Sequence, residues 1–228
     1  MQMVDSVGFD YIPSHTCRML RSGENLTLVA EWAELLDRDK LLNHPAAVKF
    51  SNLIDKAPFV SDSSLVLFRG RYLTVDAPRT NQMGPPETTT DSRYAPGQPV
   101  LYLSDSEKGV NQELDAYPQE GVRYLQRYRL PFDQLRIRDF TKFPPDDFLT
   151  AVFSKAEECN LEGYGIKSCT FSQTVAGMVA TNSDGMRVPG VRGNRDFSYS
   201  NVVVFQPFPA WPKWLEPDST PYRLSPQQ

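Results

Sequence analysis

Residues 82–113 combine turn-forming, apolar and helix-starting residues within one short stretch. The apolar run Pro99 to Leu103 lies between a glycine-containing turn and a polar segment, which predicts a short, mostly buried strand. Ser106 can cap a helix over residues 107–116, because a serine oxygen accepts hydrogen bonds from the free amides of a first helical turn. Glu113 then lies about two turns into that helix. The strand-to-helix junction can therefore fold this carboxylate back towards the strand.

The loop before this strand carries an arginine and a tyrosine. Pro85 with Pro86, and Pro96 with Gly97, are residue pairs that favour turns because proline fixes its backbone and glycine accepts unusual torsion angles. These turns deliver Arg93 and Tyr94 to the beginning of the strand. The loop thus adds a cation and an aromatic ring to the polar groups around it.

A second strand, predicted over residues 63–75, changes character along its length. Alternation puts Leu67, Arg69 and Arg71 on one face and Tyr72 on the other. A face that changes from leucine to arginine leaves the core for a cleft or for solvent.

The remaining periodicity predicts an α+β fold rather than a doubly wound sheet, because strands are separated by single helices or by short turns. The segment from Asn201 to Phe205 is apolar and β-branched enough to form a central strand. We expect four helices, over residues 24–38, 45–57, 146–158 and 171–181. The first has its apolar residues on one buried face, and Asn43 caps the second. Further strands are expected over 122–130, 135–140 and around 185–205.

Composition excludes several functional classes. With 228 residues and a formal charge of −4, the chain suits one soluble domain with an appendage and lacks the basic footprint of a general nucleic-acid-binding protein. No apolar run reaches the ~18 residues of a membrane span, so we expect a cytoplasmic protein. Three cysteines at no metal-like spacing and two histidines predict reduced, structural thiols and no metal site.

The order of motifs in this chain resembles the RES domain family, which is named for its Arg, Glu and Ser. The resemblance covers residues 65–205. It rests on FRGR (68–71), MGPP (83–86), SRYAPGQPVLYLSDS (92–106), Glu113, LRIRDFT (135–141), Ser172-Gln173, DGMRVPGVRG (184–193) and SNVVVF (200–205).

The resemblance implies a split mixed β-sheet with a cleft, similar to that of ADP-ribosyltransferases. It also implies a toxin of a bacterial toxin-antitoxin pair that uses NAD as substrate, needs no prosthetic group and is neutralised by an antitoxin or immunity protein. We expect residues 63–206 to form the catalytic domain and residues 207–228 a proline-rich tail anchored by its tryptophans. Residues 1–62 are expected to form a helical extension that is a lid, a homo-oligomer surface or a layer packed on that domain.

Each job in NAD cleavage has a candidate residue in the matched motifs. Guanidinium groups pair with phosphate oxygens, so Arg69 and Arg93 are the first candidates for binding the pyrophosphate, and Arg71 is the next. Tyr102 is the first candidate for the aromatic ring that packs against nicotinamide, and Tyr94 and Tyr72 are the next. The carboxylate that stabilises positive charge at the ribose is Glu113. The predicted catalytic residues are therefore Glu113, Arg69 and Tyr102.

The chain departs from the family pattern at two positions. Pro189-Gly190 stands where the family usually has a proline-serine pair, and Ala95 replaces an asparagine. Ser198 or Ser200 can supply a hydroxyl from nearby, and Gly190 can still contribute a backbone amide to ligand binding.

Three hypotheses remain open from the sequence. The first is a RES-type toxin that cleaves the nicotinamide-ribose bond of NAD by hydrolysis or phosphorolysis, or that transfers ADP-ribose to a protein target. The second is a RES-like nucleotide- or protein-binding module with weakened catalysis. The third is an unrelated α+β domain, which a sheet without a cleft at Tyr102 would reveal.

Overall fold

The computed structural model describes residues 23–85, 93–95, 97–116, 118–142, 147–161, 169–190, 198–217 and 219–224, without the side chains of 147 and 157–161. Within these residues the chain has the α+β class that its periodicity predicts, and it is built on a seven-stranded mixed sheet. The strand order is β4-β5-β6-β2-β1-β3-β7, and only β4 and β5 run parallel. The strands are β1 (Leu67–Leu73), β2 (Val100–Ser104), β3 (Val122–Tyr128), β4 (Ile137–Asp139), β5 (Gly185–Pro189), β6 (Ser200–Phe205) and β7 (Tyr222–Arg223).

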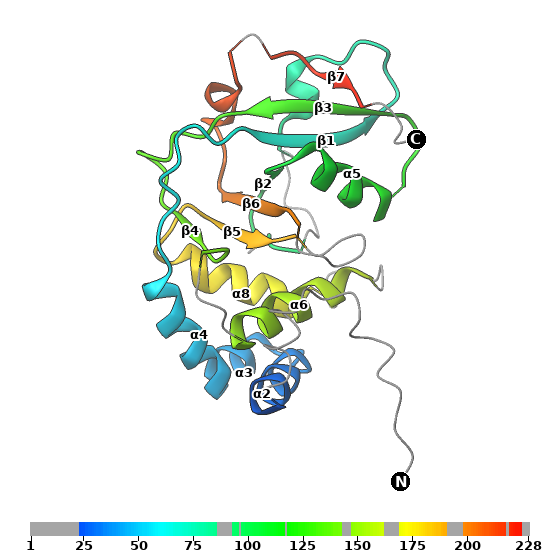
Figure 1. The fold of residues 1–228 in the computed structure, drawn as a ribbon. Coiled ribbons are helices and arrows are strands. Elements are labelled where there is room, and N and C mark those ends of the chain that lie inside the picture. Colours follow the sequence, from blue (N-terminus) through cyan, green and yellow to red (C-terminus); the bar gives the residue numbers. More distant parts are fainter. Residues whose placement is uncertain are drawn as a thin grey trace.

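The helices divide into two groups (Figure 1). One helix, α5, lies against β1 and β2, whereas α8 packs on β5 and is covered in turn by α6 and the N-terminal helices. The α-helices are α2 (Gly23–Ala33), α3 (Arg38–Asn43), α4 (Pro45–Lys56), α5 (Glu107–Ala116), α6 (Asp147–Leu161) and α8 (Thr170–Ala180), with short 3₁₀ helices η1 (Thr80–Met83) and η2 (Trp211–Trp214).

Two predictions for the N-terminal helices were wrong in detail. The helix expected over residues 24–38 ends at Ala33, because Asp37 caps a separate helix by accepting a hydrogen bond from the Lys40 amide at 2.9 Å. Leu36, expected on the buried face, lies in the break between the two helices and is 77% exposed. The cap of α4 is His44 rather than Asn43, since the His44 ring nitrogen accepts from the Ala46 amide at 3.2 Å.

Two apolar clusters occupy the two faces of the sheet around β5, β6 and β2. The larger joins the helices α2–α4, α6 and α8 to the sheet and contains Trp32, Phe50 and Phe153. The smaller includes Trp211 and Trp214 of the C-terminal segment, so the prediction that these tryptophans anchor the tail to the body is confirmed.

The sheet is weakly joined between β1 and β2. These strands pair at a single position, Phe68 opposite Ser104, whereas β1 pairs with β3 along all seven of its residues. On its other side β2 pairs with β6 along its whole length. The sheet therefore consists of two well-paired parts that separate after Phe68 on β1 and before Ser104 on β2.

Helix α5 crosses the junction of these two parts. It approaches β1 so closely that a side chain at Gly70 would overlap Val110 and Leu114 of the helix. Ser106 caps this helix as predicted, accepting a hydrogen bond from the Gly109 amide at 3.0 Å. The bounds expected from the sequence, 107–116, are confirmed.

We predict that Gly70→Ala lowers the free energy of unfolding by about 1–3 kcal/mol, the usual cost of forcing an extra group into a packed contact. The measurement is urea unfolding followed by circular dichroism. Gly23→Ala is the control, because a Cβ there meets no atom within 4 Å. Equal unfolding midpoints for the two variants would contradict the close approach of α5.

Candidate functional site

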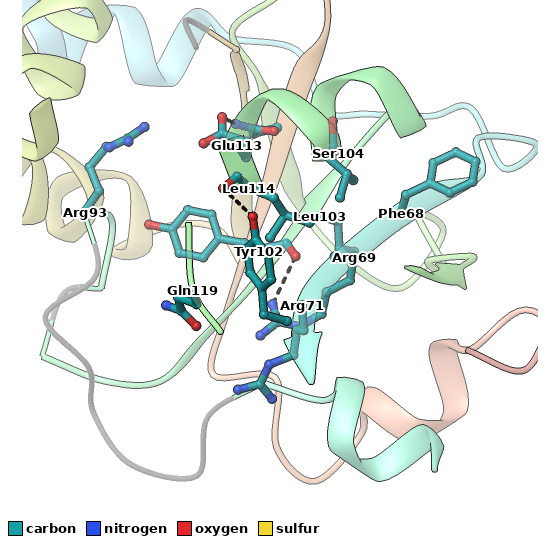
Figure 2. A pocket seen from close by; sticks show the side chains of 14 residues that line it. Phe68, Arg69, Arg71, Arg93, Tyr102, Leu103, Ser104, Glu113, Leu114 and Gln119 are labelled. Atoms are coloured by element: carbon teal, nitrogen blue, oxygen red, sulfur yellow. Dashed lines mark hydrogen bonds between the residues drawn. The ribbon is translucent and has the colours of Figure 1, made fainter. Parts of the chain in front are cut away.

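A cavity of about 580 Å³ opens where β1 and β2 separate (Figure 2). Its walls come from β1, β2, α5, β6 and the loops before β2 and after α5. The lining residues are Phe68, Arg69, Gly70, Arg71, Tyr72, Arg93, Tyr102, Leu103, Ser104, Val110, Glu113, Leu114, Gln119 and Asn201. Six of the eight residues singled out from the sequence are among them, and the exceptions are Tyr94 and Gly190.

The cavity is positive although the whole chain is negative. Three arginines line it, and Glu113 is the only acidic residue among the described residues of its wall. In the view of Figure 2, Tyr102 lies between Arg93 and the pair formed by Arg69 and Arg71. An anion with an attached aromatic group fits this distribution of charge and ring.

Arg69 bridges the gap between the separating strands. Its Nη1 donates to the backbone oxygen of Tyr102 at 3.2 Å, where a fully paired sheet would have an inter-strand backbone bond. Its Nε is buried and has no hydrogen-bond partner among the described residues. Burial, reinforced by the neighbouring Arg71 charge, lowers the pKa of Arg69 to about 10, so the side chain remains a cation at neutral pH.

Arg71 holds the segment that follows β1. Its Nη1 donates to the backbone oxygens of Gln82 at 2.8 Å and Gly84 at 3.4 Å, which ties the 3₁₀ helix η1 to the cavity wall. Because its partners are neutral carbonyls, the Arg71 charge is not cancelled by these contacts.

The two tyrosines of the loop and strand act together. The Tyr94 amide donates to the Tyr102 hydroxyl at 2.6 Å, and the two rings stack with centroids 6.4 Å apart. Tyr94 is only 1% exposed, so it supports Tyr102 rather than offering a ring to a ligand. Arg93 lies over the Tyr94 ring at 5.8 Å. The predicted binding role of Tyr94 therefore becomes one of support.

Tyr72 borders the cavity with its hydroxyl already engaged. The hydroxyl donates to the Leu114 backbone oxygen at 3.2 Å and accepts from Arg123 Nε at 3.0 Å. Arg123 also lies 5.3 Å from the Tyr72 ring centre. Tyr72 thus fastens the end of α5 to β1.

Glu113 reaches the cavity from the middle of α5. Its Oε1 accepts two hydrogen bonds, from the Tyr199 hydroxyl at 2.8 Å and from Asn201 Nδ2 at 2.7 Å. Both donors belong to the segment at the start of β6, so the carboxylate on α5 is held by the strand next to β2.

Gly190 does not line the cavity, and its backbone amide is engaged in the fold. That amide donates to the Tyr199 backbone oxygen at 2.8 Å. Of the two serines considered as hydroxyl donors, Ser200 is 4% exposed and donates to Asp105, while Ser198 is exposed and does not line the cavity.

Sequence reasoning missed Tyr199, Asn201 and Gln119. Asn201 begins a run that is otherwise apolar, and strand alternation alone gives no reason to pair it with Glu113. A signal was present in the spacing of Tyr199 and Asn201, since residues two apart on a strand share a face. Gln119 follows α5 at an exposed position and carries no comparable signal.

Among the described residues, no three His, Cys, Asp or Glu side chains gather in a way that could hold a metal ion. Within that same part of the chain, no helix combines the length and apolar character needed to cross a bilayer. No family model, no curated protein and no solved structure matches this chain.

We predict that the cavity binds inorganic pyrophosphate and that Arg69→Gln weakens this binding by about tenfold or more, because a hydrogen bond to a charged group contributes about 1.5–3 kcal/mol. Calorimetric titration measures the affinity. Arg129→Gln is the control, since Arg129 is 42% exposed and pairs with Glu216. Equal weakening in both variants would show that pyrophosphate binds elsewhere.

Proposed function

We propose that this protein is a RES-type enzyme that cleaves the bond between nicotinamide and ribose in NAD. The observation that carries the proposal is the convergence of three arginines, an aromatic ring and one held carboxylate on a cavity at the break in the sheet. NAD requires these three kinds of group, because it joins a pyrophosphate, a flat aromatic base and a ribose whose anomeric carbon becomes positive during cleavage. The motif order seen in the sequence supports the same assignment.

The arginines would bind the pyrophosphate. Arg69 and Arg71 are oriented by neutral carbonyl partners and keep their charge, which leaves them suited to phosphate oxygens. Arg93 lies on the other side of Tyr102 in the view of Figure 2 and would extend the positive surface. The Tyr102 ring would pack against the nicotinamide.

Glu113 would act at the ribose. As the carbon–nitrogen bond breaks, its electron pair leaves with nicotinamide and the sugar becomes oxocarbenium-like. A carboxylate fixed by two hydrogen bonds stabilises that charge without having to reorganise. The oxygen of water or phosphate then bonds to the anomeric carbon, and the proton it carries is released to solvent. A protein side chain in the same position would instead accept ADP-ribose.

In a cell, this activity would deplete NAD in the cytoplasm and arrest growth. We propose that a separate antitoxin or immunity protein neutralises it, as in the family that the motifs resemble. The fold we propose is correspondingly the RES version of an α+β fold. Its cleft would lie where β1 and β2 separate next to their single paired position.

We predict that the purified protein releases nicotinamide from NAD and that Glu113→Gln lowers kcat by about 10²–10³-fold, the usual cost of removing one group that stabilises transition-state charge. Chromatographic detection of nicotinamide, with and without phosphate, gives the rate and distinguishes phosphorolysis from hydrolysis.

The matched control is Glu107→Gln, at the exposed first position of the same helix. It changes the same chemical group on α5 and should leave kcat unaltered. No nicotinamide release by folded wild-type protein, in either buffer, would refute the enzyme proposal and favour a binding module.

A further inference from the structure

Glu113 is held by side chains that the motif comparison did not single out. We propose that Tyr199 and Asn201 are the positioning residues of the Glu113 carboxylate, and that Gly190 and Gly109 are glycines because the Tyr199 ring needs their space. The inference rests on the proposed function, since it concerns how the carboxylate is fixed for NAD cleavage.

Both donors bind one oxygen of the carboxylate. The Tyr199 hydroxyl and Asn201 Nδ2 lie 2.8 and 2.7 Å from Glu113 Oε1. Two donors converging on one oxygen fix both the position of the carboxyl group and its rotation about the last side-chain bond. A glutamate on a helix otherwise has three rotatable bonds and many alternatives.

The donors themselves are buried and therefore well placed to act. Tyr199 is 4% exposed and Asn201 is 7% exposed. Hydrogen bonds to a carboxylate are about twice as strong as neutral ones, and low exposure reduces competition from water. Glu113 is half-buried and lines the cavity, so its carboxylate lies at the cavity wall.

The Tyr199 ring is confined between two glycines. A Cβ at Gly190, just after β5, would overlap the ring, and a Cβ at Gly109 on α5 would overlap both the ring and the Ser104 hydroxyl. Neither glycine has the positive backbone torsion that other residues avoid, so space and not torsion explains the residue type. The Gly190 amide also donates to the Tyr199 backbone oxygen.

The residue between the two donors is anchored on the opposite side. The Ser200 amide donates to Asp105 Oδ1 at 2.9 Å, and Arg187 pairs with Asp105 Oδ2 at 3.0 Å. Asp105 belongs to the junction that leads into α5. The segment that carries the donors is thereby fixed to the segment that carries Glu113.

The test compares Tyr199→Phe, Gly190→Ala and the double variant in the nicotinamide-release assay. Tyr199→Phe keeps the ring and removes only the donor, so kcat should fall by about tenfold with KM changed less than about twofold. Gly190→Ala keeps the donor and displaces the ring, so it should act on kcat in the same way. Because both changes break the same hydrogen bond, from the Tyr199 hydroxyl to Glu113, the double variant should be no slower than the slower of the two single variants.

Tyr222→Phe is the matched control. It also removes a tyrosine hydroxyl that donates to a carboxylate of α5, at Glu107 and 2.6 Å, but it lies outside the cavity wall. Its kcat and KM should equal those of wild type. If Gly190→Ala does not fold, the comparison of Tyr199→Phe with Tyr222→Phe decides the question alone.

The outcomes separate the two proposals. Active wild type with an unchanged kcat in Tyr199→Phe overturns the positioning role and leaves NAD cleavage standing. An equal loss in Tyr222→Phe shows a general effect on α5 and also overturns it. Inactive wild type refutes the proposed function and the inference with it.

Discussion

The fold depends on how β1 and β2 separate after a single backbone pair. An opened sheet leaves strand-edge groups without their usual partners, and buried groups of this kind are costly. The Arg69 side chain meets this requirement by donating to the Tyr102 oxygen across the gap. The same half-buried side chain brings a cation into the cavity, and desolvation lowers its pKa to about 10. One side chain therefore satisfies a strand-edge oxygen and contributes to the positive charge of the site.

Helix α5 converts this opening into a site. It lies on both parts of the sheet, and Gly70 allows it to approach β1 closely. Its start is fixed by the Ser106 cap and its later part by the bond between Tyr72 and Leu114. The position of Glu113 along the helix follows from these two attachments, before any contact with β6 is considered.

Local signals in the sequence predicted the elements around the site well, and tertiary contacts explain what they missed. The strand at 99–103 and the helix at 107–116 were predicted because turn residues and a serine cap mark them directly. The helix at 24–38 was predicted too long because the apolar spacing continues past Ala33, where the first helix ends. Asp37 caps a separate helix after that break. The role of Gly190 could not be predicted, since it depends on Tyr199, whose ring occupies the space beside it.

The polar groups of the cavity are oriented before any ligand binds. Carbonyl oxygens hold Arg69 and Arg71, and a backbone amide holds the Tyr102 hydroxyl. A carboxylate partner would orient an arginine equally well but would neutralise it, whereas a carbonyl fixes the guanidinium and leaves a full positive charge. Because the directing partners are neutral, an incoming anion gains the charge interaction without first breaking an ion pair to these two arginines. Backbone groups of β2, of the segment around η1 and of the loop before β2 thus orient these side chains and leave the charges of both arginines uncancelled.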